Sequence, residues 1–164
     1  MPEGGLVPRV KHYFEKGRFY HITTRTEGGA YLLGSDTAKN IIVQAVSHYR
    51  EHRRLRLFGF VVMSNHFHMV VQDTGADLSQ TLAALKRWTA GRLTQHGALR
   101  EGVWERRFDD NAVLDSRELR TVIEYDHLNP VRACLVARAE DYFWSSARNY
   151  ANLSPVAMEI DKGW

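Results

Sequence analysis

The sequence predicts an α+β protein of the ferredoxin-like, RRM-like class, an antiparallel sheet with helices packed on one face. One observation is the order of local patterns, which runs β, α, β, β, α, β, α. Another is an almost continuous apolar stretch over residues 55–72, where a Ser-Asn pair at 64–65 indicates a tight turn between two strands. The third is size, because 164 residues that are 44% hydrophobic can form the core of one domain.

The first strand and the first helix precede that hairpin. Residues 17–25 mix aromatic and β-branched side chains with polar ones and end near a glycine pair at 28–29, which is typical of a strand and its turn. Ser35 or Asp36 can cap a helix that continues to about Arg54, because apolar residues recur there at helical spacing.

A second helix and a short extended segment follow the hairpin. Asp77 or Ser79 can begin this helix, and a glycine is expected to end it around residues 96–97. Residues 102–114 carry apolar pairs on both sides of a charged centre, which predicts a short extended segment.

The third helix is expected to begin at Asp115 or Ser116. Glu118 strengthens this prediction, because an acidic residue at that spacing can complete a capping box. Pro130 should end the helix soon after Asn129, since proline cannot continue the helical hydrogen-bond pattern.

Composition suggests how the chain is organised and which classes of protein it does not match. We expect a loose N-terminal leader over residues 1–16, one domain over 17–150 and a C-terminal tail over 151–164. The single cysteine, Cys134, excludes an internal disulfide or a redox motif. No segment approaches the roughly 20 apolar residues of a membrane helix. A cytoplasmic protein without a membrane partner is therefore expected.

The charge is weakly basic and unevenly distributed. A formal net charge of +3 and a pI near 9.1 permit a nucleic-acid partner without requiring one. Arginines cluster over residues 50–56, and basic residues outnumber acidic ones over residues 86–107. Such clusters are also typical of solvated helix faces, so they favour a polyanionic partner only in combination with other signals.

The strongest chemical signal in the hairpin is the pair His66 and His68. Two residues apart on one strand, their imidazoles project from the same face, whereas Phe67 and Met69 project from the other. The pair can share one ion and leave coordination positions open for water or substrate. The same spacing also occurs in histidines that bind no metal, and it leaves both interpretations open.

A second signal lies on the third helix, where Tyr125 and Asn129 are four residues apart and share one face. If this helix packs across the histidine face, the Asn129 amide oxygen completes a His-His-Asn metal site and Tyr125 stands one turn away. A helical tyrosine alone is more often a packing residue. We expect His21 to pack or face DNA rather than bind metal, and His127 to lie on a different helix face.

Four blocks of sequence follow one another in a distinctive order: residues 60–68 (FVVMSNHFH), 103–108 (VWERRF), 125–133 (YDHLNPVRA) and 144–146 (WSS), after an opening YHIT at 20–23. In this order and spacing they resemble the REP-associated tyrosine transposases, within the HUH single-tyrosine transposases. The resemblance covers nearly the whole chain. One departure is Ser64, where relatives often have proline, and it should alter the turn more than the chemistry.

The resemblance implies a metal-dependent transposase, a DNA strand transferase that cleaves and rejoins single-stranded DNA near hairpin-forming repeats. Tyr125 would be the nucleophile and would form a 5′-phosphotyrosine. His66, His68 and Asn129 would hold Mg²⁺ or Mn²⁺. Ligand chemistry alone leaves the metal open, because two imidazoles and an amide also suit zinc.

Contacts with DNA are expected from residues in or beside the same blocks. Arg106, Arg107 and Arg132 are expected to hold phosphates of single-stranded or hairpin DNA. Trp104 and Phe108 can stack on unpaired bases, although core packing is the commoner role of such residues. Monomer and homodimer both remain open.

Two other functions are compatible with the same fold. One is a non-catalytic regulator that binds DNA hairpins, which would not need the Tyr125 hydroxyl. The other is a hydrolytic metal-dependent nuclease, in which water attacks and Tyr125 only packs.

Overall fold

The computed structural model describes residues 12–97 and 102–164, so residues 1–11 of the predicted leader lie outside the described residues. The helices and strands are β1 (Phe19–Arg25), α1 (Asp36–Glu51), β2 (Arg56–Val62), β3 (His66–Gln72), α2 (Leu78–Gln95), β4 (Asp109–Val113), α3 (Ser116–Arg132) and α4 (Ala147–Tyr150). Single 3-10 turns occupy Glu27–Gly29 and Ala139–Asp141.

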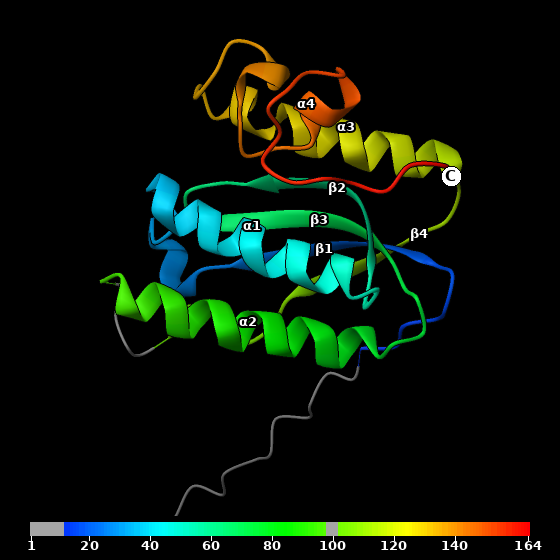
Figure 1. Ribbon diagram of the computed structural model, residues 1–164, viewed down its shortest axis with the longest axis horizontal. Coiled ribbons are helices and arrows are strands. Elements are labelled where there is room, and N and C mark those ends of the chain that lie inside the picture. The colour runs from blue at the N-terminus through cyan, green and yellow to red at the C-terminus, as the bar shows by residue number, and fades with distance from the viewer. Residues whose placement is uncertain (1–11, 98–101) are drawn as a thin grey trace, which may run out of the picture.

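The four strands form one antiparallel sheet in the order β2-β3-β1-β4. Helices α1 and α2 lie side by side on one face of this sheet, which confirms the predicted ferredoxin-like class (Figure 1). Helix α3 follows this βαββαβ unit and covers the opposite face, over β2 and β3. The sheet therefore lies between two layers of helix.

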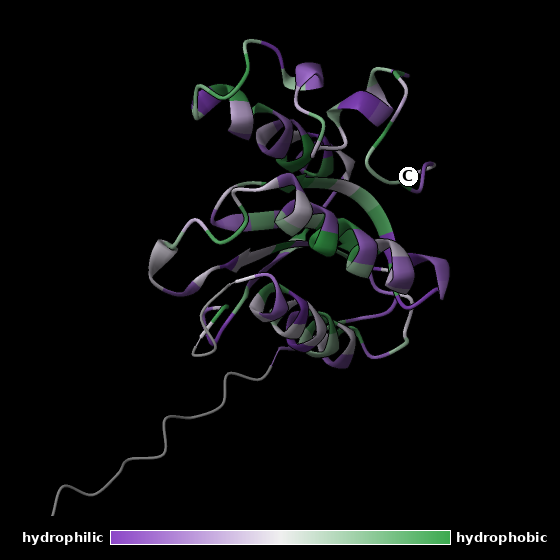
Figure 2. Ribbon diagram, turned by 60° about the vertical axis from the view of Figure 1, so that its left-hand side comes forward, coloured by the Kyte–Doolittle hydropathy of each residue, from purple (hydrophilic) through white to green (hydrophobic). Residues whose placement is uncertain are grey.

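The alternation of side chains along the central strands separates the main core from the α3 face. Tyr20 and Ile22 on β1, and Phe67 and Met69 on β3, are buried in the core under α1 and α2. Hydrophobic residues gather along the sheet and along the helix surfaces that face it (Figure 2). The intervening residues of both strands, His68 among them, point toward α3.

Close packing holds α3 against the sheet. Gly59 on β2 permits this approach, because a Cβ atom there would lie 3.3 Å from Cγ1 of Ile123. Phe58, Val70, Leu119 and Ile123 form a second, smaller core around this contact. Apolar packing at one glycine thus helps to set the position of α3 over the histidine face.

The ends of α3 agree with the sequence patterns. The Asp115 side chain accepts a hydrogen bond from the backbone amide of Glu118 (2.8 Å), and the Glu118 carboxylate accepts one from the amide of Leu114 (2.7 Å). Pro130 lies inside the last turn, and the helix ends at Arg132, soon after Asn129 as predicted.

Two predicted boundaries were wrong by a few residues. Helix α1 ends at Glu51 rather than near Arg54, because Arg53 adopts a left-handed backbone conformation with φ 54°. Within the predicted extended segment, strand β4 begins only at Asp109, and Trp104 forms an isolated bridge with Thr26.

The C-terminal tail packs on the body of the protein. Met158 and Ile160 are buried in the main core. The Asp161 carboxylate accepts a hydrogen bond from the amide of Leu57 at 2.8 Å, and the amide of Asp161 donates to the Leu57 carbonyl at 2.6 Å. These bonds occupy the outer edge of β2 at that point. Among the described helices, none is both long and apolar enough to cross a membrane.

We predict that stability falls with acidification partly because of His127. Its Nε2 lies 2.8 Å from the Ser146 hydroxyl, and burial lowers the pKa of His127 to about 4. In the unfolded chain His127 takes up a proton near its ordinary pKa of 6.5, whereas in the folded protein it does so only near 4. The stability is therefore fully present above pH 6.5 and is lost as the pH falls from there toward 4. The loss is on the order of 3 kcal/mol, at about 1.4 kcal/mol per pKa unit.

Urea unfolding at several pH values measures this effect. His127→Gln should show a shallower pH dependence than the wild type between neutral pH and the pKa of about 4. Parallel losses in both proteins would rule His127 out as a source of the acid sensitivity.

Candidate active site

Helix α3 crosses the sheet so that its polar stripe meets the histidines of β3. Nδ2 of Asn129 lies 3.4 Å from Nε2 of His66, and the rings of Tyr125 and His68 have centroids 6.5 Å apart. The structure thus brings together all four residues that sequence patterns selected on separate elements.

Hydrogen bonds orient both imidazoles. Nδ1 of His66 donates to Oδ1 of Asn65 at 2.7 Å, which leaves Nε2 of His66 as the free nitrogen toward Asn129. Nδ1 of His68 lies 2.8 Å from the hydroxyl of Thr23, its cross-strand partner, so Nε2 of His68 is free when Nδ1 carries the proton. Such partners fix the ring orientation that a metal ligand needs.

Burial keeps both imidazoles neutral, the form that binds metal. Desolvation lowers the pKa of His66, and the nearby charge of Arg25 lowers it further. Desolvation lowers the pKa of His68 to about 3, with smaller contributions from His66, His21 and Arg25. Their lone pairs are therefore available at neutral pH.

The ring planes show which histidines can share an ion, since an imidazole binds a cation along a lone pair in its own plane. The rings of His66 and His68 meet at 75° with centroids 4.9 Å apart, so their lone pairs can converge. His21 and His68 are stacked at 21° with centroids 5.1 Å apart. Donor atoms of His21, His68 and Asp126 do lie within 4.8 Å of one another, but stacked rings disfavour joint ligation.

Asn129 fits as a third ligand after a rotation of its side-chain amide. Its NH₂ group faces His66, and turning the amide by a half circle would present the oxygen to an ion in the same place. Two neutral imidazoles and one amide oxygen suit a divalent cation and leave coordination positions for a phosphate oxygen. The donor set thus fits a divalent cation.

Tyr125 is accessible, as an attacking group must be. Its side chain is 51% exposed, one helical turn before Asn129. The guanidinium of Arg132 lies 4.5 Å from the centre of the Tyr125 ring and donates a hydrogen bond to the Tyr125 carbonyl at 3.2 Å. A positive charge therefore lies beside the candidate nucleophile.

Sequence reasoning missed a buried pair next to Tyr125. Nε2 of His21 lies 2.9 and 3.1 Å from the two carboxylate oxygens of Asp126, whose side chain is fully buried. Desolvation raises the pKa of Asp126, and the hydrogen bond from His21 opposes that rise. The pair ties β1 to α3 immediately after Tyr125. A signal existed, because Asp126 precedes Asn129 by three residues and shares its helix face.

We predict that His21→Ala strongly destabilises the fold, because it leaves the Asp126 carboxyl buried without its partner. The expected cost is about 3–5 kcal/mol in the free energy of unfolding. Asp126→Asn removes the charge but retains a hydrogen-bonding group, so its cost should be smaller. Urea unfolding of both variants measures the difference, and equal, small losses would show that the pair does not hold α3 in place.

The residues expected to contact DNA occupy different environments. Arg106 and Arg107 are exposed, and Phe108 is half-buried in a stack with His12. Trp104 is only 8% exposed, packs against Phe67 and donates from Nε1 to the hydroxyl of Thr89 at 3.0 Å. We propose no base stacking for Trp104, because its role in this structure is core packing.

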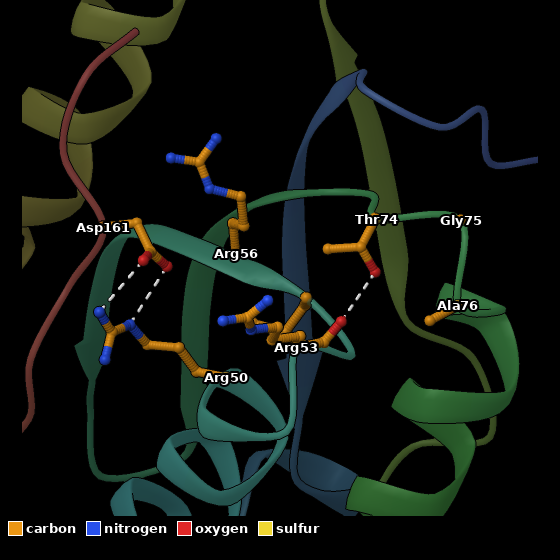
Figure 3. A pocket seen from close by; sticks show the side chains of 8 residues that line it. Arg50, Arg53, Arg56, Thr74, Gly75, Ala76 and Asp161 are labelled. Atoms are coloured by element: carbon orange, nitrogen blue, oxygen red, sulfur yellow. Dashed lines mark hydrogen bonds and ion pairs between the residues drawn. The ribbon is translucent and has the colours of Figure 1, made fainter.

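The arginine cluster at residues 50–56 lies at the other end of β3 from His66. It borders a cavity of about 550 Å³ (Figure 3). Arg50 is already paired with the carboxylate of Asp161 at 3.1 Å, and the Arg56 guanidinium turns away toward Phe58. The cavity therefore offers a phosphate fewer free positive charges than the run of arginines in the sequence suggests.

Comparison with known proteins places this chain in a family. Residues 16–127 match the model of the IS200-like transposases, and the chain belongs to that family. It is 23% identical over 142 residues to a protein assigned as a REP-associated tyrosine transposase from Haemophilus influenzae, covering 74% of this chain and 81% of the relative. The resemblance predicted from the sequence is confirmed, and the protein is a transposase by family.

Solved structures share the fold. A REP-associated tyrosine transposase bound to a REP hairpin superposes with a TM-score of 0.73 at 20% identity, over 94% of this chain and 92% of that one. A protein assigned as a transposase from Deinococcus radiodurans gives a TM-score of 0.52 at 14% identity, over 72% of this chain and 95% of that one.

Proposed function

We propose that this protein is a metal-dependent transposase that cleaves and rejoins single-stranded DNA through a covalent bond to Tyr125. The observation that carries the proposal is one of geometry. An exposed tyrosine lies beside His66, His68 and Asn129, three groups suited to one divalent cation. The family membership of the chain agrees with DNA transfer as the overall reaction.

In the proposed step, the Tyr125 hydroxyl oxygen attacks a backbone phosphorus, a P–O bond forms and the hydroxyl proton is released. The bond from phosphorus to the 3′ oxygen breaks, and that oxygen leaves as a 3′-hydroxyl after taking up a proton. The product is a 5′-phosphotyrosine, which a 3′-hydroxyl of another end can attack in the reverse sense. One difficult exchange is thereby divided into two reversible steps.

The divalent ion, Mg²⁺ or Mn²⁺, would polarise a phosphate oxygen and stabilise the charge that develops on it. Other residues of the chain would hold the metal ligands and Tyr125 in position. Asn65 and Thr23 fix the imidazoles, and the His21–Asp126 pair fixes α3 next to Tyr125. We propose that Arg132, whose guanidinium lies 4.5 Å from the centre of the Tyr125 ring, holds the phosphate that Tyr125 attacks.

We propose hairpin-forming repeats as the substrate, because the solved structure that superposes with a TM-score of 0.73 is bound to a REP hairpin. The catalytic unit would span residues 17–150, completed by the C-terminal tail, whose Met158 and Ile160 are buried in the main core. The proposed nucleophile and the three proposed metal ligands lie together within one chain.

Trapping a covalent protein–DNA adduct tests the proposal. The purified protein is incubated with labelled single-stranded DNA from the repeats flanking its own gene, with Mn²⁺, and run on a denaturing gel. An adduct supports the transposase. Cleavage without an adduct indicates the hydrolytic nuclease, and binding without cleavage indicates the non-catalytic regulator.

The phosphate contacts lead to a prediction about salt. Arg106→Ala, Arg107→Ala and Arg132→Ala should each reduce the magnitude of the slope of log affinity against log salt by about 0.7. Each variant makes one phosphate contact fewer and so releases fewer counterions. Affinity at several salt concentrations measures this, with Arg117→Ala, also exposed, as a control. Wild-type slopes in all three variants would remove these arginines from the DNA path.

A further inference from the structure

A cavity of about 470 Å³ adjoins the candidate metal site. It is bordered by Tyr31 after β1, by the turn between β2 and β3, and by the end of α3 with Leu135 beyond it. His66 and Asn129 line both this cavity and the candidate metal site. We call it the Tyr31 pocket.

The walls of the Tyr31 pocket are neutral. None of the residues that line it is a lysine, arginine, aspartate or glutamate. Tyr31 is 78% exposed and Leu135 is 50% exposed, while Ser64 adds a hydroxyl to the lining. A phosphate would find no positive side chain here. A neutral, planar group with an apolar face and polar edges fits such walls. The volume of the pocket is typical of small-ligand sites, at about 300–1,000 Å³.

Position suggests which planar group can reach the pocket. A phosphate held between Tyr125 and the ion carries nucleotides on both sides, and His66 and Asn129 line the pocket as well as the candidate metal site. We infer that the Tyr31 pocket holds the base of an unpaired nucleotide adjoining the phosphate that is cut, stacked on the Tyr31 ring. This inference rests on the proposed function and adds a specificity site to it.

Stacking on an exposed aromatic ring should have a measurable effect. Loss of one base–aromatic stack weakens binding by about 5-fold to 150-fold. Because stacking tolerates any base, sequence preference would come from the polar edges around Ser64 and Asn65. The Tyr31 ring itself would register only whether a base is present.

A thermodynamic cycle between Tyr31 and the DNA tests the inference. Binding is measured in the Tyr125→Phe background, so that the DNA stays intact, with oligonucleotides carrying an abasic nucleotide at each position flanking the cut site in turn. Tyr31→Ala should bind intact DNA about 5-fold to 150-fold more weakly. At one abasic position, the variant and its parent should bind equally. Tyr31→Phe, which keeps the ring, should restore binding.

Leu114→Ala serves as a matched control, because Leu114 is 80% exposed and does not line the pocket. If Tyr31→Ala weakens binding by the same factor at every abasic position, or not at all, the pocket holds no base. An absence of adduct with the wild type would instead overturn the proposed function. The two failures are therefore distinguishable.

Discussion

Tyr125→Phe is expected to abolish adduct formation and cleavage while leaving DNA binding nearly unchanged. The substitution removes one hydroxyl, the attacking atom, so the rate should fall by about 10⁴-fold or more. The side chain is 51% exposed and its ring contact with Arg132 survives in phenylalanine. Stability should therefore change by no more than about 0.5 kcal/mol. A denaturing gel with labelled DNA measures the rate.

Tyr150→Phe is a suitable control, because the Tyr150 hydroxyl donates a hydrogen bond to the Phe58 carbonyl at 2.7 Å and is not one of the proposed catalytic groups. It should cut DNA at the wild-type rate. Near-normal cleavage by Tyr125→Phe would exclude Tyr125 as the nucleophile and would favour attack by water.

His66→Ala and His68→Ala are expected to lose metal-dependent cleavage. Loss of a residue that merely supports a metal ligand commonly costs about 10–100-fold in affinity, so loss of a ligand should cost at least the upper value. Asn129→Ala should weaken metal binding less, because a neutral amide is the poorest ligand of the three. Calorimetric titration with Mn²⁺ measures these affinities, and a chelator should abolish DNA cleavage by the wild-type enzyme.

His52→Ala provides the comparison, since His52 is an exposed histidine at the end of α1. Its affinity for Mn²⁺ should equal that of the wild type. His68 is 7% exposed, so the unfolding midpoint of His68→Ala must be checked before its metal affinity is interpreted. Unchanged metal affinity in both the His66 and His68 variants would refute the site.

Much of the fold was predictable because its signals are local. The turn at residues 64–65, the cap at Asp115 and the glycine that follows α2 depend on neighbours in the chain. Where boundaries were wrong, the cause was also local but invisible in the pattern. Arg53 takes a left-handed conformation that ends α1, and an arginine in the sequence does not predict such a conformation.

The sequence by itself determined which chemical groups share a surface. A strand period of two puts His66 and His68 on one face, and a helical period puts Tyr125 and Asn129 on another. These relations follow from backbone geometry alone. They predicted the members of the candidate site, and the structure places those members together.

The tertiary structure alone decided how these surfaces meet. Gly59 lets α3 approach β2, which places Asn129 over His66. The same packing joins His21 to Asp126 across 105 residues and brings the end of α3 beside Tyr31. On the other face of the sheet, packing against α2 buries Trp104. Such contacts depend on the complementary shape and volume of side chains distant in sequence, and no local period encodes them.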